Sequence, residues 1–272
     1  MVSIIIPCFN DVEFIKQSVN SALSQTYESK EIIIVDDGSN VDTKLILNQL
    51  KPKIDKLITQ ENKGQSTARN IGIDHAKGEY VLVLDSDDFF EPSFCEEAIN
   101  VFMQNGKIKI VSCFANLIYE NKFRGVYKPS GGDLKAILIN NIAMGSIVFK
   151  KKEWGYAKGY DEAMRDGFED WEFYLRLLSN GGEVFIIEKP LFNYRQRSNS
   201  TTSRANKKKY ELLKYIYIKH KNLYVDNYEL ILSHLLNKIE REETEKFKKV
   251  NSIEYKIGLL ILKPLRFLKS LF

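Results

Sequence analysis

The sequence predicts an α/β protein with a mostly parallel sheet, helices on both faces of the sheet, and a C-terminal helical extension. Two observations lead to this fold class. Short apolar segments alternate with longer amphipathic segments between residues 2 and 118, as in the β-α-β units of parallel sheets. The short segments, such as "SIIIP" and "EIIIV", are apolar almost throughout, which is typical of strands covered on both faces.

The expected strands and helices alternate along this region. Each strand is a short apolar run that ends in a turn, and strands are expected at 2–7, 31–39, 56–61, 80–85 and 108–118. Each helix carries apolar residues on one face, and helices are expected at 11–25, 42–51, 64–78 and 92–106. A proline at the start and a glycine at the end mark the last of these helices.

After residue 120 the pattern becomes less regular. The segment 123–133 is expected to form a loop or the edge of a hairpin, and 142–154 a loop that leads into a short strand. A helix is expected at 168–182, followed at 184–197 by a strand pair or by one strand bent at Pro190. From about residue 205 the chain is expected to form helices with basic ends.

Composition and spacing exclude several classes of protein. The three cysteines are far apart, no CxxC pair occurs, and the three histidines have no ligand spacing, so neither a disulfide framework nor a zinc site is expected. No signal peptide is expected at the N-terminus, and no run of 18 apolar residues is long enough to span a membrane. These features predict a cytoplasmic protein.

A cluster of acids follows the expected strand 80–85. Asp85, Asp87 and Asp88 lie within four positions in "DSDD", and their carboxylates repel one another unless a cation lies among them. Ligands in open parallel sheets bind at the carboxyl ends of the strands, where this cluster is placed. Carboxylate oxygens without nearby His or Cys suit Mg²⁺ or Mn²⁺, so we expect one of these ions, bound together with substrate phosphates.

Four segments of the chain resemble family-2 glycosyltransferases of the GT-A fold. They are "VSIIIPCFND", "IIIVDDGS", "NKGQSTARNIGIDHAKGEYVLVLDSDD" and "EDWEFYLRL", and the resemblance covers about residues 1–200. It implies an inverting hexosyl- or N-acetylhexosaminyltransferase that uses a UDP-sugar donor and a glycan or lipid-linked glycan acceptor. It also implies a role in the assembly of bacterial surface polysaccharides.

The resemblance implies a domain division and a donor site. The GT-A domain would span 1–203, with a nucleotide-binding half at about 1–115 and an acceptor half at about 116–203, and the basic helical extension would span 204–272. The implied nucleotide-sugar contacts are Pro7, Phe9, Asn10, Asp37, Arg69, Asp85 and Asp87. Asp37 would accept a hydrogen bond from the uracil N–H, since an ionised carboxylate only accepts.

Other readings of these donor-site residues stay open. From the residues alone, Phe9 fits a core aromatic as well as a surface for base stacking, and Arg69 also fits a clamp on the acidic loops. Asp87 and Asp88 would hold the metal of this DXD-type motif and the ribose, in a division that the sequence does not settle. Asp85 would support the conformation of the acidic loop.

The same resemblance places the catalytic base at the start of the helix 168–182. Asp170 would take the proton from the acceptor hydroxyl, whereas an ordinary helix N-cap or dipole partner is the alternative for this acid. Acceptor or diphosphate contacts are implied for Met144, Gly145, Glu169, Trp171, Arg195 and Arg197. Trp171 would stack on a sugar or simply pack in the core.

One position departs from the pattern of the family. Where many relatives carry "YRxH", this chain has "YRQR", so Arg197 replaces a histidine. A guanidinium stays protonated and cannot bind a metal, although it can grip a diphosphate. Either the metal therefore has fewer protein ligands, or Arg195 and Arg197 share the neutralisation of charge.

The C-terminal segment is basic and amphipathic. Residues 201–272 contain 16 Lys and Arg against 8 Asp and Glu, whereas the whole chain has a net charge of only +4. The segment 254–272 suits a helix lying on the inner face of the membrane or, alternatively, one docked on the domain. Nucleic acid is not an expected partner, because no base-reading motif accompanies the basic residues.

The sequence can be compared with the requirements of three other functions. A haloacid dehalogenase-like phosphatase needs its acidic loop after the first strand, and a dinucleotide-binding dehydrogenase needs G-x-G-x-x-G there; neither motif is present. A non-catalytic sugar-nucleotide-binding subunit of a polysaccharide assembly complex remains the alternative to an enzyme.

Overall fold

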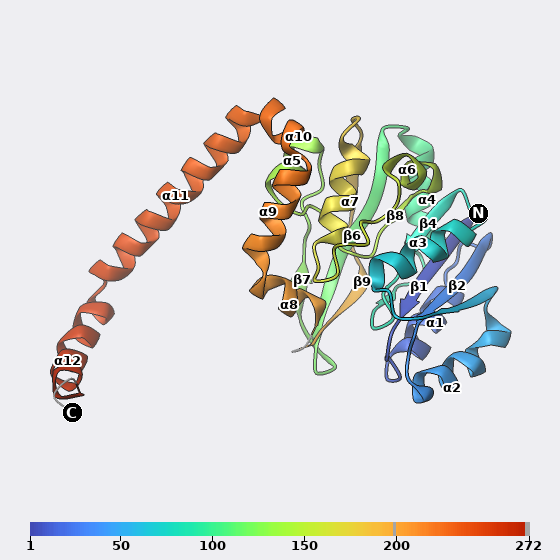
Figure 1. The fold of residues 1–272 in the computed structure, drawn as a ribbon, viewed down its shortest axis with the longest axis horizontal. Coiled ribbons are helices and arrows are strands. Elements are labelled where there is room, and N and C mark those ends of the chain that lie inside the picture. The colour runs from blue at the N-terminus through green and yellow to red at the C-terminus, as the bar shows by residue number, and fades with distance from the viewer. Residues whose placement is uncertain (198–199, 270–272) are drawn as a thin grey trace. The chain divides into compact units, whose positions relative to one another are not determined.

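The computed structural model describes residues 1–197 and 200–269, in which nine strands form one central sheet (Figure 1). The strands are β1 (Val2–Cys8), β2 (Lys30–Asp37), β3 (Lys56–Gln60), β4 (Tyr80–Val83), β5 (Phe89–Phe90), β6 (Ile108–Tyr119), β7 (Lys122–Tyr127), β8 (Val148–Lys150) and β9 (Glu183–Gln196). Their order across the sheet is β3-β2-β1-β4-β8-β6-β9-β5, and β7 pairs with β6.

The sheet is parallel through its first half and mixed beyond it. β1 pairs in parallel with β2 and β4, β2 with β3, and β6 with β9. The short strand β8 lies antiparallel between β4 and β6, and β5 and β7 pair antiparallel with β9 and β6. The expected bend at Pro190 is a shift of register within one strand, β9, so a single bent strand forms rather than a pair.

Twelve α-helices lie in the described residues. They are α1 (Ile15–Leu23), α2 (Val41–Leu50), α3 (Gln65–His75), α4 (Phe94–Gln104), α5 (Leu134–Ile139), α6 (Lys151–Ala157), α7 (Glu169–Leu178), α8 (Thr201–Lys207), α9 (Lys209–Lys219), α10 (Lys221–Asp226), α11 (Tyr228–Asn251) and α12 (Ile253–Lys269). The chain divides into two compact units, Met1–Lys221 and Asn222–Phe272.

Both faces of the sheet are covered, which confirms the predicted architecture. Ile4 and Ile6 of β1 are fully buried in the core that also contains apolar residues of α1, α2 and α4. Ile5 points to the other face, where α3 packs so closely that a Cβ added at Gly72 would lie 2.4 Å from the Ile5 Cγ2 atom. This close approach holds α3 on the sheet and brings Arg69, one turn earlier, to the carboxyl ends of the strands.

Helix α9 is attached to the sheet domain through a buried carboxylate. The Glu172 side chain on α7 is fully buried and pairs with Arg176, with Lys219 at the end of α9, and with His220. Burial alone would raise the pKa of Glu172, but the hydrogen bonds from His220 and Arg176 lower it to about 2. The first compact unit therefore includes α8 and α9, and the predicted domain boundary at residue 203 stays a prediction.

The second unit consists mainly of α11 and α12. Its apolar side chains are largely exposed, including Leu236 on α11 and Ile253, Leu260 and Ile261 on α12. Among the described helices, none combines the length and the apolar character needed to cross a bilayer. Of the segment 254–272 that was expected to contact a membrane, residues 270–272 lie outside the described part of the chain.

Candidate active site

A cavity of about 940 Å³ opens at the carboxyl ends of β1, β2 and β4. Most residues that the sequence analysis assigned to the site line it: Pro7, Phe9, Asp37, Arg69, Asp85, Asp87, Asp88, Met144, Gly145, Glu169, Asp170, Arg195 and Arg197. These residues come from seven separate segments of the chain. The fold therefore brings the acidic loop after β4 and the acids at the start of α7 to one pocket.

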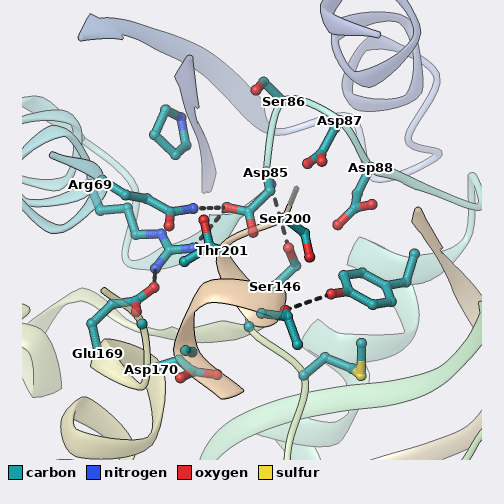
Figure 2. A pocket seen from close by; sticks show the side chains of 18 of the residues that line it. Arg69, Asp85, Ser86, Asp87, Asp88, Ser146, Glu169, Asp170, Ser200 and Thr201 are labelled. Carbon is teal, nitrogen blue, oxygen red and sulfur yellow. Dashed lines mark hydrogen bonds and ion pairs between the residues drawn. The ribbon is translucent and has the colours of Figure 1, made fainter. Parts of the chain in front are cut away.

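Arg69 connects these two groups of acids (Figure 2). Its side chain is 1% exposed, and its two terminal nitrogens lie 2.8 Å from the Asp85 Oδ1 and 2.7 Å from the Glu169 Oε1. Burial would lower the pKa of Arg69, but the charges of Asp85 and Glu169 raise it well above its usual value. The Tyr160 ring lies 5.3 Å from the guanidinium carbon. This geometry favours the clamp on the acidic loops that the sequence left open.

Two further cations reach the acidic loop from β9 and the residue after it. The Arg195 backbone N–H donates to the Asp88 Oδ1 at 2.7 Å, and its guanidinium donates to the Asp87 carbonyl oxygen. Arg197 forms an ion pair with the Asp87 carboxylate. Burial, and then the charges of neighbouring acids, still raise the pKa of Asp87, and raise that of Asp88 well above its usual value.

The donor set of this loop fits a hard divalent cation with few protein ligands. In the part of the chain that the structure describes, no three Asp, Glu, His or Cys side chains are arranged to hold a metal ion by themselves. Mg²⁺ in phosphate-transferring sites is commonly held by one or two carboxylates, with substrate phosphates and water as the other ligands. Asp87 and Asp88 supply two such carboxylates, and burial, followed by the charges of neighbouring acids, raises their pKa values.

Asp170 lies at the first turn of α7, across the pocket from this loop (Figure 2). Its Oδ2 accepts a hydrogen bond from the Asn141 Nδ2 at 2.9 Å, and its Oδ1 accepts one from the backbone N–H of Trp171 at 2.8 Å. Burial raises the pKa of Asp170 above its usual value, although these two hydrogen bonds oppose the shift. The carboxylate is therefore held in one orientation and has an increased affinity for a proton.

The ends of β1 and β2 form the other side of the cavity. The Phe9 side chain is 49% exposed, which argues against a core role. Asp37 is 3% exposed and accepts hydrogen bonds from the Gln60 side chain and from the backbone N–H groups of Lys63 and Gly64. A carboxylate offers about four acceptor positions, so one position of Asp37 is left for a ligand.

Two of the predicted site residues do not line the cavity. The Asn10 Oδ1 accepts from the Asn40 backbone N–H at 2.7 Å, so this side chain ties together the loops after β1 and β2. Trp171 is 7% exposed, and its indole N–H donates to the Ile137 carbonyl oxygen at 2.7 Å. Packing is therefore the role that the structure favours for Trp171.

Several residues of the site were not found from the sequence. Asp11 is buried beside the acidic loop, where it accepts a hydrogen bond from Ser86. Asn141 holds Asp170 although it lies 29 positions earlier, and no local motif marks it. The helix α8 adds Thr201, Arg204 and Ala205 to the wall. Of these residues, only Asp11 could have been predicted from the sequence, since it follows "PCFN" at the end of an expected strand.

The sequence also matches a known protein family. The sequence profile described as glycosyl transferase family 2 matches residues 3–141, which include the ends of β1, β2 and β4 and the acidic loop. The chain belongs to glycosyl transferase family 2. It is accordingly a glycosyltransferase.

Relatives of this glycosyltransferase match well beyond that segment. An uncharacterized glycosyltransferase of Haemophilus influenzae is 28% identical over 96% of this chain and 95% of its own length. The chondroitin synthase of Escherichia coli is 31% identical over 71% of this chain, which corresponds to 28% of that protein. The crystal structure of S. aureus TarS 1-349 in complex with UDP-GlcNAc matches 94% of this chain and 77% of that one, with a TM-score of 0.71 at 19% identity. The last match confirms the GT-A fold.

The Arg69 clamp makes a first prediction. Arg69→Gln is expected to lower the free energy of unfolding by about 3–5 kcal/mol, because it leaves Asp85 and Glu169 without their buried counter-ion. The measurement is chemical denaturation followed by tryptophan fluorescence, since Trp154 and Trp171 both lie in the first compact unit.

Lys189→Gln is the matched control for this prediction. Lys189 pairs with Glu97 at 2.8 Å, but its side chain is 62% exposed, so its loss should cost less than about 1 kcal/mol. If both variants lose the same small amount of unfolding free energy, the pairing of Arg69 with Asp85 and Glu169 does not stabilise the site.

Proposed function

We propose that this glycosyltransferase is an inverting enzyme that moves a hexosyl or N-acetylhexosaminyl group from a UDP-sugar to a hydroxyl of a glycan or lipid-linked glycan. The observation that carries the proposal is the placement of Asp87 and Asp88 on one side of the cavity and Asp170 on the other (Figure 2). Inverting transfer needs the metal-diphosphate site and the catalytic base opposite one another, since the acceptor attacks from the side away from the leaving group.

The donor nucleotide would lie at the ends of β1 and β2. Phe9 offers an exposed ring for stacking on a base, and the remaining acceptor position of Asp37 suits the N3–H of uracil. Cytosine has no hydrogen on N3, so the same carboxylate would disfavour CDP. A UDP-sugar donor is supported further by the bound UDP-GlcNAc of TarS, which has the same fold.

The diphosphate would lie at the acidic loop. Asp87 and Asp88 would hold Mn²⁺ or Mg²⁺, which neutralises the negative charge of the departing diphosphate. Arg69 fixes Asp85 at the base of the loop and so supports the two ligands. Arg195 keeps Asp88 in place through its backbone N–H, at a distance of 2.7 Å.

The chemical step would depend on Asp170. Its carboxylate takes the proton of the acceptor hydroxyl while the acceptor oxygen forms a bond to the anomeric carbon. The bond from that carbon to the diphosphate breaks, and UDP leaves with the electron pair. The raised pKa brings Asp170 closer to the working pH, where a general base is most effective. Asn141 directs the carboxylate into the pocket.

The acceptor would enter past Met144 and Gly145, which line the cavity near Asp170. A Cβ added at Gly145 would lie 3.8 Å from the Asp170 Oδ2, so Gly145 lies next to the proposed base. A polysaccharide role is supported by the similarity to chondroitin synthase and by the general resemblance noted above. We assign the enzyme to the assembly of a bacterial surface polysaccharide.

The role of Asp170 makes a second prediction. Asp170→Asn is expected to bind UDP with unchanged affinity in calorimetry but to form glycoside product about 10²–10⁴-fold more slowly, because an amide cannot accept the proton. Product would be measured by mass spectrometry with UDP-glucose, UDP-galactose and their N-acetylated forms, using bacterial lipid-linked glycan as acceptor.

Asp166→Asn is the control for this change. Asp166 lies shortly before α7 but pairs with Lys208 at the surface, so its loss should leave the rate unchanged. Equal rates in Asp170→Asn and the parent enzyme would remove Asp170 as the base. Binding of UDP without any glycoside product from the parent enzyme would favour the non-catalytic subunit.

We also propose that the segment 254–272 contacts the inner face of the cell membrane. The support is on α12, where Leu260 is 75% exposed, Ile261 is 61% exposed, and Lys256 adds positive charge. Such a helix lies in a bilayer interface with its apolar side chains among the acyl chains. A peripheral position would bring the enzyme to a lipid-linked acceptor.

Binding to vesicles tests this contact and makes a third prediction. Leu260→Glu should reduce partitioning onto vesicles of phosphatidylcholine and phosphatidylglycerol by about tenfold or more, since burial of one Leu contributes roughly 1.5–3 kcal/mol. Deletion of 254–272 should have a larger effect and leave the first unit folded. Unchanged partitioning of both variants would support a helix docked on the protein instead.

A further inference from the structure

Arg197 differs from the other cations of the site in its exposure. The Arg69 side chain is 1% exposed, whereas that of Arg197 is 44% exposed. Arg197 nevertheless pairs with Asp87, and its second terminal nitrogen lies 3.5 Å from the Asp11 Oδ1. A partly exposed guanidinium that lines the cavity is therefore paired with Asp87.

The other acids of the loop have partners that cannot leave without unfolding part of the site. Asp85 is paired with the buried Arg69, and Asp88 with the backbone N–H of Arg195. Asp11 also accepts a hydrogen bond from Ser86 at 2.8 Å. Of the three acids in "DSDD", Asp87 is the one whose carboxylate pairs with a partly exposed guanidinium. The Arg197 side chain is 44% exposed, so water can solvate its guanidinium when the pair opens, which lowers the cost of opening.

Asp87 is also one of the two carboxylates that we assign to the divalent cation. Arg197 and the cation therefore need the same carboxylate. Arg197 cannot itself bind the cation, because a guanidinium stays protonated, but it can bind two oxygens of a diphosphate at once. A diphosphate in the cavity would give Arg197 a new anionic partner when it leaves Asp87.

We propose that Arg197 exchanges Asp87 for the donor diphosphate when the cation and the nucleotide bind. The proposal rests on the function proposed above and adds a regulation of the same site. Arg197 keeps Asp87 neutralised before the donor arrives and weakens binding of the cation alone. Once the diphosphate is present, Arg197 binds it and releases Asp87. The cation and the nucleotide thus enter together, and Arg197 increases the coupling between them.

Phe14 provides a place for this exchange to occur. The guanidinium carbons of Arg195 and Arg197 lie 4.4 and 5.4 Å from the centre of the Phe14 ring. An arginine stacked on an aromatic ring retains a favourable contact when its hydrogen-bond partner changes. Arg197 can therefore turn from Asp87 toward the cavity without losing its position at the edge of the acidic loop.

The exchange predicts effects of opposite sign in one variant. Arg197→Met keeps an apolar side chain against Phe14 and offers no oxygen that could bind a metal. The variant should bind Mn²⁺ alone about tenfold more tightly, because the competitor for Asp87 is gone, and should bind UDP in the presence of Mn²⁺ about tenfold more weakly; both are within the usual range of coupling between sites. Free Mn²⁺ is measured by electron paramagnetic resonance, and UDP binding by calorimetry.

Arg124→Met is the control, since it removes the same charge from an exposed residue of β7 that contacts Tyr119 rather than the acidic loop. It should bind both ligands as the parent enzyme does. A structural defect in Arg197→Met would weaken binding of both ligands, and a simple phosphate contact would leave binding of Mn²⁺ alone unchanged. Either result would contradict the exchange while leaving the proposed function intact. Failure of the parent enzyme to bind Mn²⁺ even with UDP would contradict the metal assignment and the exchange together.

Discussion

The site depends on a single buried cation. Arg69 lies on α3, next to the point where Gly72 allows that helix to approach β1, and pairs with Asp85 and Glu169 at once. A buried guanidinium is stable only when its charge is matched, and here the match comes from segments far apart in the sequence. One interaction thereby sets the position of the acidic loop relative to the start of α7, where Asp170 lies.

The acids of the site differ in how firmly their cationic partners hold them. Asp85 and Glu169 are fixed by the buried Arg69, whereas Asp87 is paired with the more exposed Arg197. Fixed pairs preserve the geometry that transfer requires, whereas a pair that can open leaves room for the metal and diphosphate proposed for the site. Burial and the charges of neighbouring acids raise the pKa values of Asp87 and Asp88, although Arg197 and Arg195 oppose these shifts. The divalent cation proposed for the site would add positive charge at this loop.

The sequence predicted the parallel half of the fold because its strands are buried on both faces and its turns carry distinctive residues. The acidic loop was predicted because three acids directly follow a buried strand, whereas the role of Asp170 at the start of α7 was implied only by the family resemblance. Contacts between distant segments were not predictable. Arg69 meets Glu169 across 100 positions, and Asn141 reaches Asp170 from a segment without a motif. A short strand was expected within 142–154, but the antiparallel place of the three-residue β8 between β4 and β6 could not be predicted from so short a segment.

The most direct test of the account is a comparison of UDP and CDP by thermal unfolding, each with and without Mn²⁺. These ligands differ only in the base, at the group that Asp37 is proposed to recognise. At about 100 times its Kd, a ligand that binds only the native state stabilises it by about 2.7 kcal/mol. We expect UDP to raise the melting temperature by about 5 °C or more, more strongly with Mn²⁺, and CDP to raise it much less. No rise with UDP, or equal rises with UDP and CDP, would contradict the account.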